Sequence, residues 1–168
     1  MAHQYHLADL FETVAATVPE RVAVQSNRLT LTFAELDARA TRLASGLAAR
    51  GIGRGDTVGL FLTNCAEHLE TYVALFKLGA VPFNVNFRYG VEELAYLFDN
   101  ARAAAVIHSA QFGETTAALC ARLPHLRLAV AVDDGSGMAC PGSAPYDELL
   151  ETAPAGPWER HDDDMLLT

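Results

Sequence analysis

The sequence of 168 residues is poor in cysteine and in basic residues, and it has no long hydrophobic run. Its three cysteines, Cys65, Cys120 and Cys140, are odd in number and include no closely spaced pair. This pattern excludes a disulfide framework and a paired-cysteine zinc site, and it indicates a reducing, cytoplasmic location. No uncharged apolar run approaches the ~20 residues that a membrane-spanning helix needs. The segment Met1–His6 lacks a basic start, so we expect no signal peptide.

The charge balance is acidic, with 12 Lys and Arg against 21 Asp and Glu and a net charge of −9. This excess argues against general binding to nucleic acid or to anionic membranes, although one arginine or one helix N-terminus can still hold a phosphate. Apolar residues make up 51% of the chain, which excludes a disordered protein. The length indicates one domain or a piece of a larger one.

Residues 1–56 are predicted to form a helix, a β-hairpin and a second helix. The first helix begins near Leu7 and ends before Pro19. The hairpin strands are Arg21–Gln25 and Leu29–Thr32. Thr32 and Glu35 have the spacing of a capping box, which opens the second helix, and Gly51 ends it.

Residues 57–132 are predicted to alternate between buried strands and helices, with Asn64 capping the first helix and Gly79 ending it. This alternation is typical of βαβ units, so we expect an α/β fold with a mostly parallel sheet flanked by helices. Residues 133–145 and 153–157 are predicted to be connectors, and a new apolar run begins at Met165. The expected strands are Val58–Leu62, Val81–Val85, Ala104–Ile107 and Leu128–Val132, and the expected later helices are Glu92–Asp99 and Phe112–Leu123.

Several features that could bind a ligand have a simpler structural explanation. The glycine-rich segment 51–55 lies between a helix and a strand, whereas a phosphate loop lies between a strand and a helix. The acidic segment 161–164 has no glycine to wrap an ion, so we interpret it as a solvated linker. Cys65 lies at a helix N-terminus, where its pKa could fall, but a packed thiol is the better interpretation. His3 and His6 suggest nothing specific.

Arg88 is the candidate binding residue of the sequence. It follows the carboxyl end of a predicted parallel strand, and open α/β sheets bind ligands outside those ends. Its guanidinium group could grip a phosphate. The structural alternative is an ion pair with Glu92 or Glu93 on the following helix, and the residues alone do not decide between the two.

The sequence resembles the adenylate-forming superfamily, which includes acyl-CoA synthetases, at motifs that occur in family order along nearly the whole chain. Segment 31–36 resembles the superfamily's LTYxEL motif, segment 51–58 its GVGKGDRV turn, and segment 75–82 its LKAGAVxxP motif. Segment 163–168 resembles the strand that leads into the phosphate loop. The resemblance implies that residues 1–168 are the N-terminal fragment of the large AMP-binding domain, ending before that loop.

The resemblance also implies a function. An acyl-CoA synthetase activates a carboxylic acid, here a fatty acid by resemblance, with ATP and transfers the acyl group to CoA. The implied substrates and cofactors are therefore the acid, ATP, CoA and Mg²⁺. A homodimer is the candidate oligomeric state. In some relatives the arginine at the position of Arg88 contacts a CoA phosphate. The family's catalytic and metal-binding motifs lie beyond Thr168, so no catalytic or metal residue is assigned here, and the fragment is expected to be inactive.

Two alternatives belong to other classes. A stand-alone flavodoxin-like or receiver-like binding module would share the fold, but a receiver needs an acidic pair after its first strand, where this chain has Thr63 and Asn64. A peptide-synthetase adenylation domain would usually carry an Asp-Pro pair near residue 86, where this chain has Asn86, Phe87 and Arg88.

Overall fold

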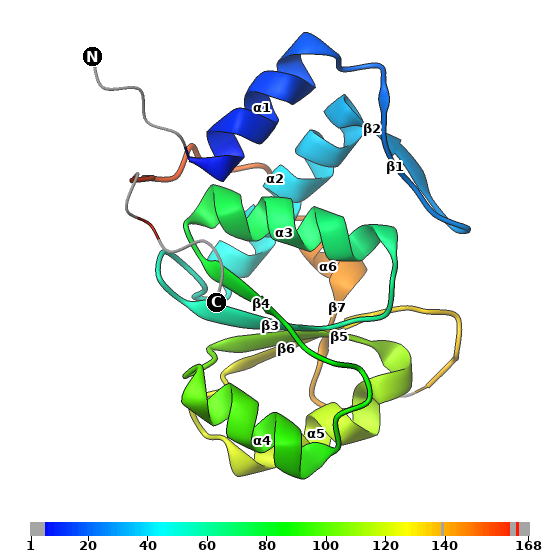
Figure 1. Cartoon of the computed structure of the whole chain (residues 1–168), viewed down its shortest axis with the longest axis vertical. Helices are drawn as coiled ribbons and strands as arrows, with labels where there is room; N and C mark the ends of the chain where they lie inside the picture. Colours follow the sequence, from blue (N-terminus) through cyan, green and yellow to red (C-terminus); the bar gives the residue numbers. More distant parts are fainter. Residues whose placement is uncertain (1–5, 139, 162–163, 165–168) are drawn as a thin grey trace.

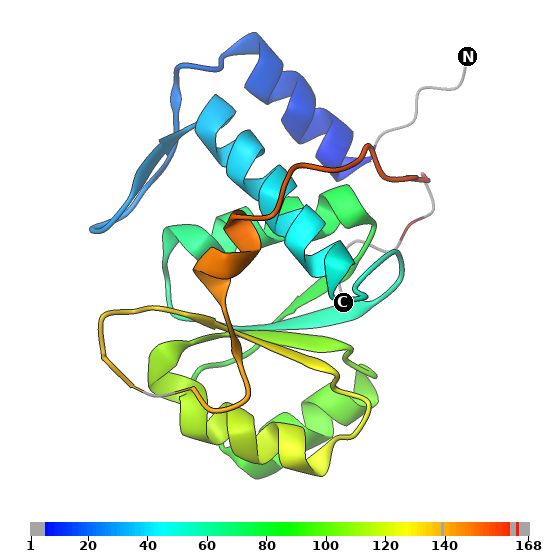
Figure 2. The same cartoon turned by 180° about the vertical axis from the view of Figure 1, so that it is seen from behind.

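The computed structural model describes residues 6–138, 140–161 and 164, which form a central sheet with helices on both faces (Figures 1 and 2). The strands are β1 (Val22–Gln25), β2 (Thr30–Thr32), β3 (Thr57–Phe61), β4 (Val81–Asn84), β5 (Ala105–Ser109), β6 (Leu128–Val132) and β7 (Ala144–Pro145). The helices are α1 (Leu7–Thr17), α2 (Phe33–Ala49), α3 (Ala66–Leu78), α4 (Val91–Asn100), α5 (Gly113–Arg122) and α6 (Tyr146–Leu150), with a 3-10 turn at Ala110–Phe112. This α/β architecture confirms the predicted fold class.

The main sheet has the order β4-β3-β5-β6-β7, and every neighbouring pair is parallel. From β3 the chain passes first to β4 on one side and then to β5 on the other. The direction of winding therefore reverses between β3 and β5, which is where open α/β sheets form a ligand crevice. Strands β1 and β2 form the predicted antiparallel hairpin as a separate sheet.

Two hydrophobic cores lie on opposite faces of this sheet, because successive side chains of a strand point to opposite faces. In the first core, Val58 and Leu60 of β3 pack with α2, α3 and α6. In the second core, Phe61 of β3 packs with α4 and α5. Strand β5 divides in the same way, with Ile107 in the first core and Val106 in the second. The central strands are therefore buried on both faces, as their continuous apolar runs predicted.

The local signals of the sequence are mostly confirmed. The amide of Glu35 donates to Thr32 Oγ1 at 3.3 Å and the amide of Thr32 donates to Glu35 Oε2 at 2.8 Å, which completes the capping box. Gly51 and Gly79 follow α2 and α3 with φ of 81° and 67°, a left-handed conformation that glycine adopts without steric cost.

Two expectations about local structure are wrong. Cys65, not Asn64, is the N-cap residue of α3, and its side chain makes no capping hydrogen bond. The predicted loop 133–145 ends in strand β7, and helix α6 follows it without having been expected. A five-residue helix has almost no stability of its own. It forms here because Tyr146 and Leu149 are buried, with Leu149 packed directly on Gly46 of α2.

The expected strand from Met165 onward lies outside the described residues. None of the helices in the described part of the chain has both the length and the apolar character needed to cross a bilayer.

Candidate functional site

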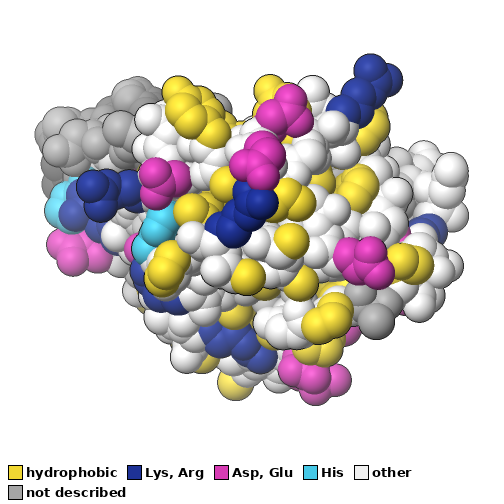
Figure 3. Space-filling view, turned by 90° about the horizontal axis from the view of Figure 1, so that it is seen from below, with side chains coloured by type: hydrophobic (Ala, Val, Ile, Leu, Met, Phe, Trp, Pro, Cys, Tyr) yellow, Lys and Arg dark blue, Asp and Glu magenta, His cyan; other side chains and the backbone are white. Residues whose placement is uncertain are grey.

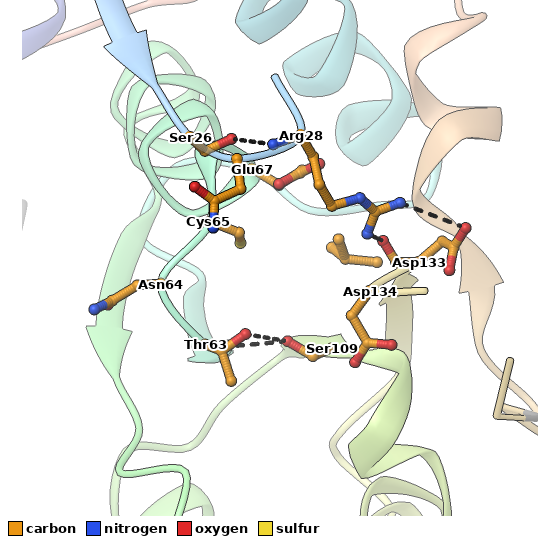
Figure 4. Close-up of a pocket in the computed structure, with 11 residues that line it drawn as sticks. Ser26, Arg28, Thr63, Asn64, Cys65, Glu67, Ser109, Asp133 and Asp134 are labelled. Atoms are coloured by element: carbon orange, nitrogen blue, oxygen red, sulfur yellow. Dashed lines mark hydrogen bonds and ion pairs between the residues drawn. The ribbon is translucent and has the colours of Figure 1, made fainter. Parts of the chain in front are cut away.

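A pocket of about 220 Å³ lies at the carboxyl ends of β3, β5 and β6 (Figure 4). We call it the carboxyl-edge pocket. Thr63 and Ser109 stand at the ends of β3 and β5, so the pocket occupies the point where the winding of the sheet reverses. The hairpin tip, the start of α3 and the loop after β6 form its other walls. Its lining residues are Ser26, Asn27, Arg28, Thr63, Asn64, Cys65, Glu67, Ser109, Val132, Asp133 and Asp134.

Thr63 and Ser109 tie the ends of β3 and β5 together. The amide of Thr63 donates to Ser109 Oγ at 3.2 Å, and the two hydroxyl oxygens are 3.5 Å apart (Figure 4). Ser109 is buried, so this hydrogen bond satisfies a hydroxyl that would otherwise be costly to bury. The pair fixes the polar floor of the pocket.

Arg28 joins the hairpin tip to the loop after β6. Its guanidinium group donates to the carbonyl oxygen of Asp133 at 2.5 Å and lies 3.8 Å from the carboxylate of the same residue. Both side chains are more than half exposed, so the pair contributes little to stability. Its consequence is geometric, because it holds the hairpin tip over the carboxyl-edge pocket.

Cys65 is a packed thiol in the pocket wall. Burial and the nearby carboxylate of Glu67 raise the pKa of Cys65 to about 11. The low pKa that its helix N-terminal position suggested is therefore wrong, and the packed-thiol interpretation holds. Because a thiol attacks as its thiolate, Cys65 is a poor nucleophile at neutral pH.

Arg88 lies beyond the end of β4, the edge strand, and it does not line the carboxyl-edge pocket. Its side chain is exposed, and its Cζ atom lies 5.6 Å from the centroid of the Phe87 ring. The alternative ion pair does not form: Glu92 pairs with Arg122 at 2.6 Å, and Glu93 accepts from the amide of Gly90 at 2.8 Å. Within the described residues, Arg88 has no ionic partner.

The glycine-rich segment 51–55 joins α2 to the amino end of β3. It therefore lies at the opposite end of this strand from the carboxyl-edge pocket. Asp56 organises it, because its carboxylate accepts from the amide of Gly53 at 2.8 Å and pairs with Arg127 at 2.8 Å. The segment precedes a strand, as the sequence indicated, and so lacks the geometry of a phosphate loop.

The described histidines and carboxylates near the chain ends have structural partners. His6 caps α1, with its Nδ1 accepting from the amide of Ala8 at 3.2 Å. Asp164 accepts from Arg54 Nε at 2.6 Å and from the amide of His161 at 2.9 Å. His3, Asp162 and Asp163 lie outside the described residues. In the part of the chain that is described, no three His, Cys, Asp or Glu residues gather as metal ligands.

Sequence reasoning missed the carboxyl-edge pocket. Its signal was nevertheless present, since Thr63 and Asp133 directly follow two predicted parallel strands and Ser109 lies two residues beyond the end of a third. What the sequence did not show is that Arg28, far away in the chain, folds back over them. A contact between residues 105 positions apart leaves no local pattern.

Comparisons with known proteins identify the relatives of the chain. Residues 11–165 match the family model described as AMP-binding enzyme. A 3-oxocholest-4-en-26-oate–CoA ligase of Rhodococcus rhodochrous is 36% identical over 96% of this chain and 30% of its own length. A medium/long-chain-fatty-acid–CoA/3-oxocholest-4-en-26-oate–CoA ligase of Mycobacterium marinum is 40% identical over 81% of this chain and 25% of its own length.

Solved structures agree with these relatives. The inhibitor-bound N-terminal domain of FACL13 from Mycobacterium tuberculosis superposes with a TM-score of 0.83 at 25% identity, covering 96% of this chain and 40% of that one. The matches favour the acyl-CoA ligase interpretation over a receiver-like module or a peptide-synthetase domain. The chain spans about 30% or less of the length of these curated relatives. On this evidence the chain belongs to the family of AMP-binding enzymes.

Proposed function

We propose that this chain is the N-terminal part of an ATP-dependent acyl-CoA ligase. The whole enzyme would activate a carboxylic acid as its acyl-adenylate, release pyrophosphate, and transfer the acyl group to CoA. The observation that supports this most is the 36% identity to a CoA ligase over 96% of the chain. Because the relatives named above act on fatty acids and on a sterol-derived acid, we propose a large hydrophobic acid as the substrate.

The described residues supply scaffold and binding surface in this proposal. Arg88 would bind a phosphate of CoA, since its guanidinium group is permanently charged, exposed and free of an ionic partner among the described residues. The described residues offer no ligand set for Mg²⁺, so no step is assigned to a metal here. The cysteine usage supports a cytoplasmic enzyme, and a homodimer stays a proposal.

The test of the Arg88 role uses the complete enzyme and separates its two half-reactions. Arg88→Ala removes one charge-assisted contact, worth about 1.5–3 kcal/mol, so the KM for CoA should rise about tenfold or more. ATP–pyrophosphate exchange needs no CoA and should stay nearly unchanged. The matched control is Arg42→Ala, which removes another exposed arginine without an ionic partner among the described residues, on α2. An equal loss in both half-reactions would contradict a CoA role.

The proposed activity itself is tested on the complete enzyme and on the 168-residue chain side by side. The complete enzyme should form acyl-CoA from a panel of fatty and sterol-derived acids. The 168-residue chain should give only background ATP–pyrophosphate exchange. Absence of acyl-CoA formation by the complete enzyme with every acid tested would contradict the proposed function.

A further inference from the structure

The carboxyl-edge pocket presents a more selective surface to a ligand than the outside of the molecule does. The face formed by α4 and α5, for example, mixes hydrophobic, acidic and basic side chains (Figure 3), so its charge does not select one kind of ligand. The pocket instead gathers polar side chains from the hairpin tip, from the ends of β3 and β5 and from the start of α3. Figure 4 shows Thr63 and Ser109 at its bottom and Arg28 and Glu67 at its top. A ligand in the pocket would lie between these two pairs.

The hydroxyl pair at the bottom of the pocket has a hydrogen atom to donate. Thr63 and Ser109 carry one hydroxyl hydrogen each, and only one of the two can lie between their oxygen atoms, which are 3.5 Å apart. Ser109 is only 1% exposed, so its hydroxyl takes the acceptor within reach, Thr63 Oγ1. Among the described residues, no further group accepts from either hydroxyl. The hydroxyl hydrogen of Thr63 is therefore free to donate to a ligand.

The top of the pocket supplies both an acceptor and further donors. Glu67 lies in the first turn of α3 and forms no ion pair with any residue that the structure describes. An ionised carboxylate accepts hydrogen bonds and donates none. Arg28 uses one of its nitrogen atoms to donate to the carbonyl oxygen of Asp133, and a guanidinium group has five N–H donors in all. A ligand that both donates and accepts would be satisfied here.

The charges around the pocket oppose a ligand of either sign. The carboxylates of Glu67, Asp133 and Asp134 line it together with a single cation, Arg28, so an anion would be repelled. A cation would meet Arg28 and the positive end of the α3 dipole. In addition, the carboxylates of Asp133 and Asp134 already accept from backbone amides, which leaves them less to offer a cation. A neutral ligand avoids these costs.

We propose that the carboxyl-edge pocket binds a neutral polyol of about monosaccharide size, with Thr63 donating to one ligand oxygen and Glu67 accepting from a ligand hydroxyl. Hydroxyl groups both donate and accept, so a molecule that carries several of them matches both ends of the pocket. The volume of about 220 Å³ is below the ~300–1,000 Å³ of pockets that hold drug-sized ligands, which selects a small molecule. The inference goes beyond the proposed function, because none of the proposed substrates is a neutral polyol.

The test follows sugar binding to the 168-residue chain by amide NMR spectroscopy. The neutral probes are ribose and glucose, and the ionic probes are inorganic phosphate and methylammonium. We expect ribose or glucose to shift the amide signals of Thr63 and Ser109 saturably. Thr63→Val, which removes the hydroxyl and keeps the shape and the amide, should weaken binding at least fivefold, whereas Thr63→Ser should bind like the unchanged chain. Thr13→Val is the matched control, since Thr13 is an exposed threonine on α1.

A second variant keeps the test decisive if Thr63→Val fails to fold, which its own spectrum would reveal. Glu67→Ala removes the acceptor without changing either core and should weaken sugar binding at least threefold. No saturable binding of either sugar, unchanged sugar binding by the folded variants, or tighter binding of phosphate or methylammonium than of both sugars would overturn the proposal. None of these measurements involves acyl-CoA formation, so such a result would leave the proposed function standing.

Discussion

At the scale of single residues, Gly59 shows how tightly the sheet packs on α4. A Cβ atom at this position would lie 2.6 Å from Phe98 Cε1 and 2.9 Å from Phe83 Cζ. Both rings are buried, so they cannot move aside freely. We expect Gly59→Ala to lower the free energy of unfolding by about 1–3 kcal/mol in urea titrations. Gly53→Ala is the matched control, because its Cβ would meet nothing within 4 Å, and it should change stability by less than about 0.5 kcal/mol.

At the scale of elements, the segment after α6 is fastened to α1 and α3 by a charged cluster. This segment passes across α2 toward α1 (Figure 2). Arg160 pairs with Asp9 at 2.5 Å and with Glu12 at 2.8 Å. Lys77 of α3, which is only 4% exposed, pairs with Glu12 at 2.5 Å and with Asp37 at 2.8 Å. Glu12 therefore serves both cations and joins three parts of the chain.

The pH dependence of stability should reveal the charged cluster. Burial works against ionisation of Glu12, but hydrogen bonds and charge from Arg160 and Lys77 outweigh it and lower its pKa from 4.5 to about 2. A carboxyl group whose pKa is lowered by folding stabilises the folded state at pH values above its pKa in the unfolded chain. For Glu12 this stabilisation is lost as the pH falls from about 4.5 to about 2. Glu12→Gln should cost about 1–3 kcal/mol at pH 7 and less toward pH 2.

Urea titrations across this pH range measure the effect of Glu12→Gln. The control is Glu20→Gln, since Glu20 is exposed and has no ion pair with any residue that the structure describes. Equal pH dependence in the two variants would contradict the role given to Glu12.

At the scale of the whole molecule, the two cores share one sheet and should unfold together. Strands β3, β5 and β6 each contribute side chains to both cores, so neither core can lose its packing while the other keeps its strands. Trp158, the single tryptophan, packs on the first core and reports on it by fluorescence. We expect its urea transition to coincide with the loss of circular dichroism. Separate midpoints would show that the cores are independent units.

Local signals accounted for most of the elements. The Thr32 and Glu35 spacing, and the glycines at 51 and 79, act over a few residues, so the sequence displays them directly. The placement of Asn64 as a cap was wrong by one residue, because the sequence pattern does not fix the exact first residue of a helix. Helix α6 was missed because its stability comes from burial of Tyr146 and Leu149 against distant residues.

The sequence by itself determined the βαβ order, the buried strands and the resemblance to adenylate-forming enzymes, because these depend on patterns along the chain. It also singled out Arg88, through its place after a strand. Only the tertiary structure decided that Arg28 closes the carboxyl-edge pocket, that Cys65 has a raised pKa and that Glu92 and Glu93 bond to groups other than Arg88. Distance, burial and charge between residues far apart in the chain control these properties, and they exist only once the chain has folded.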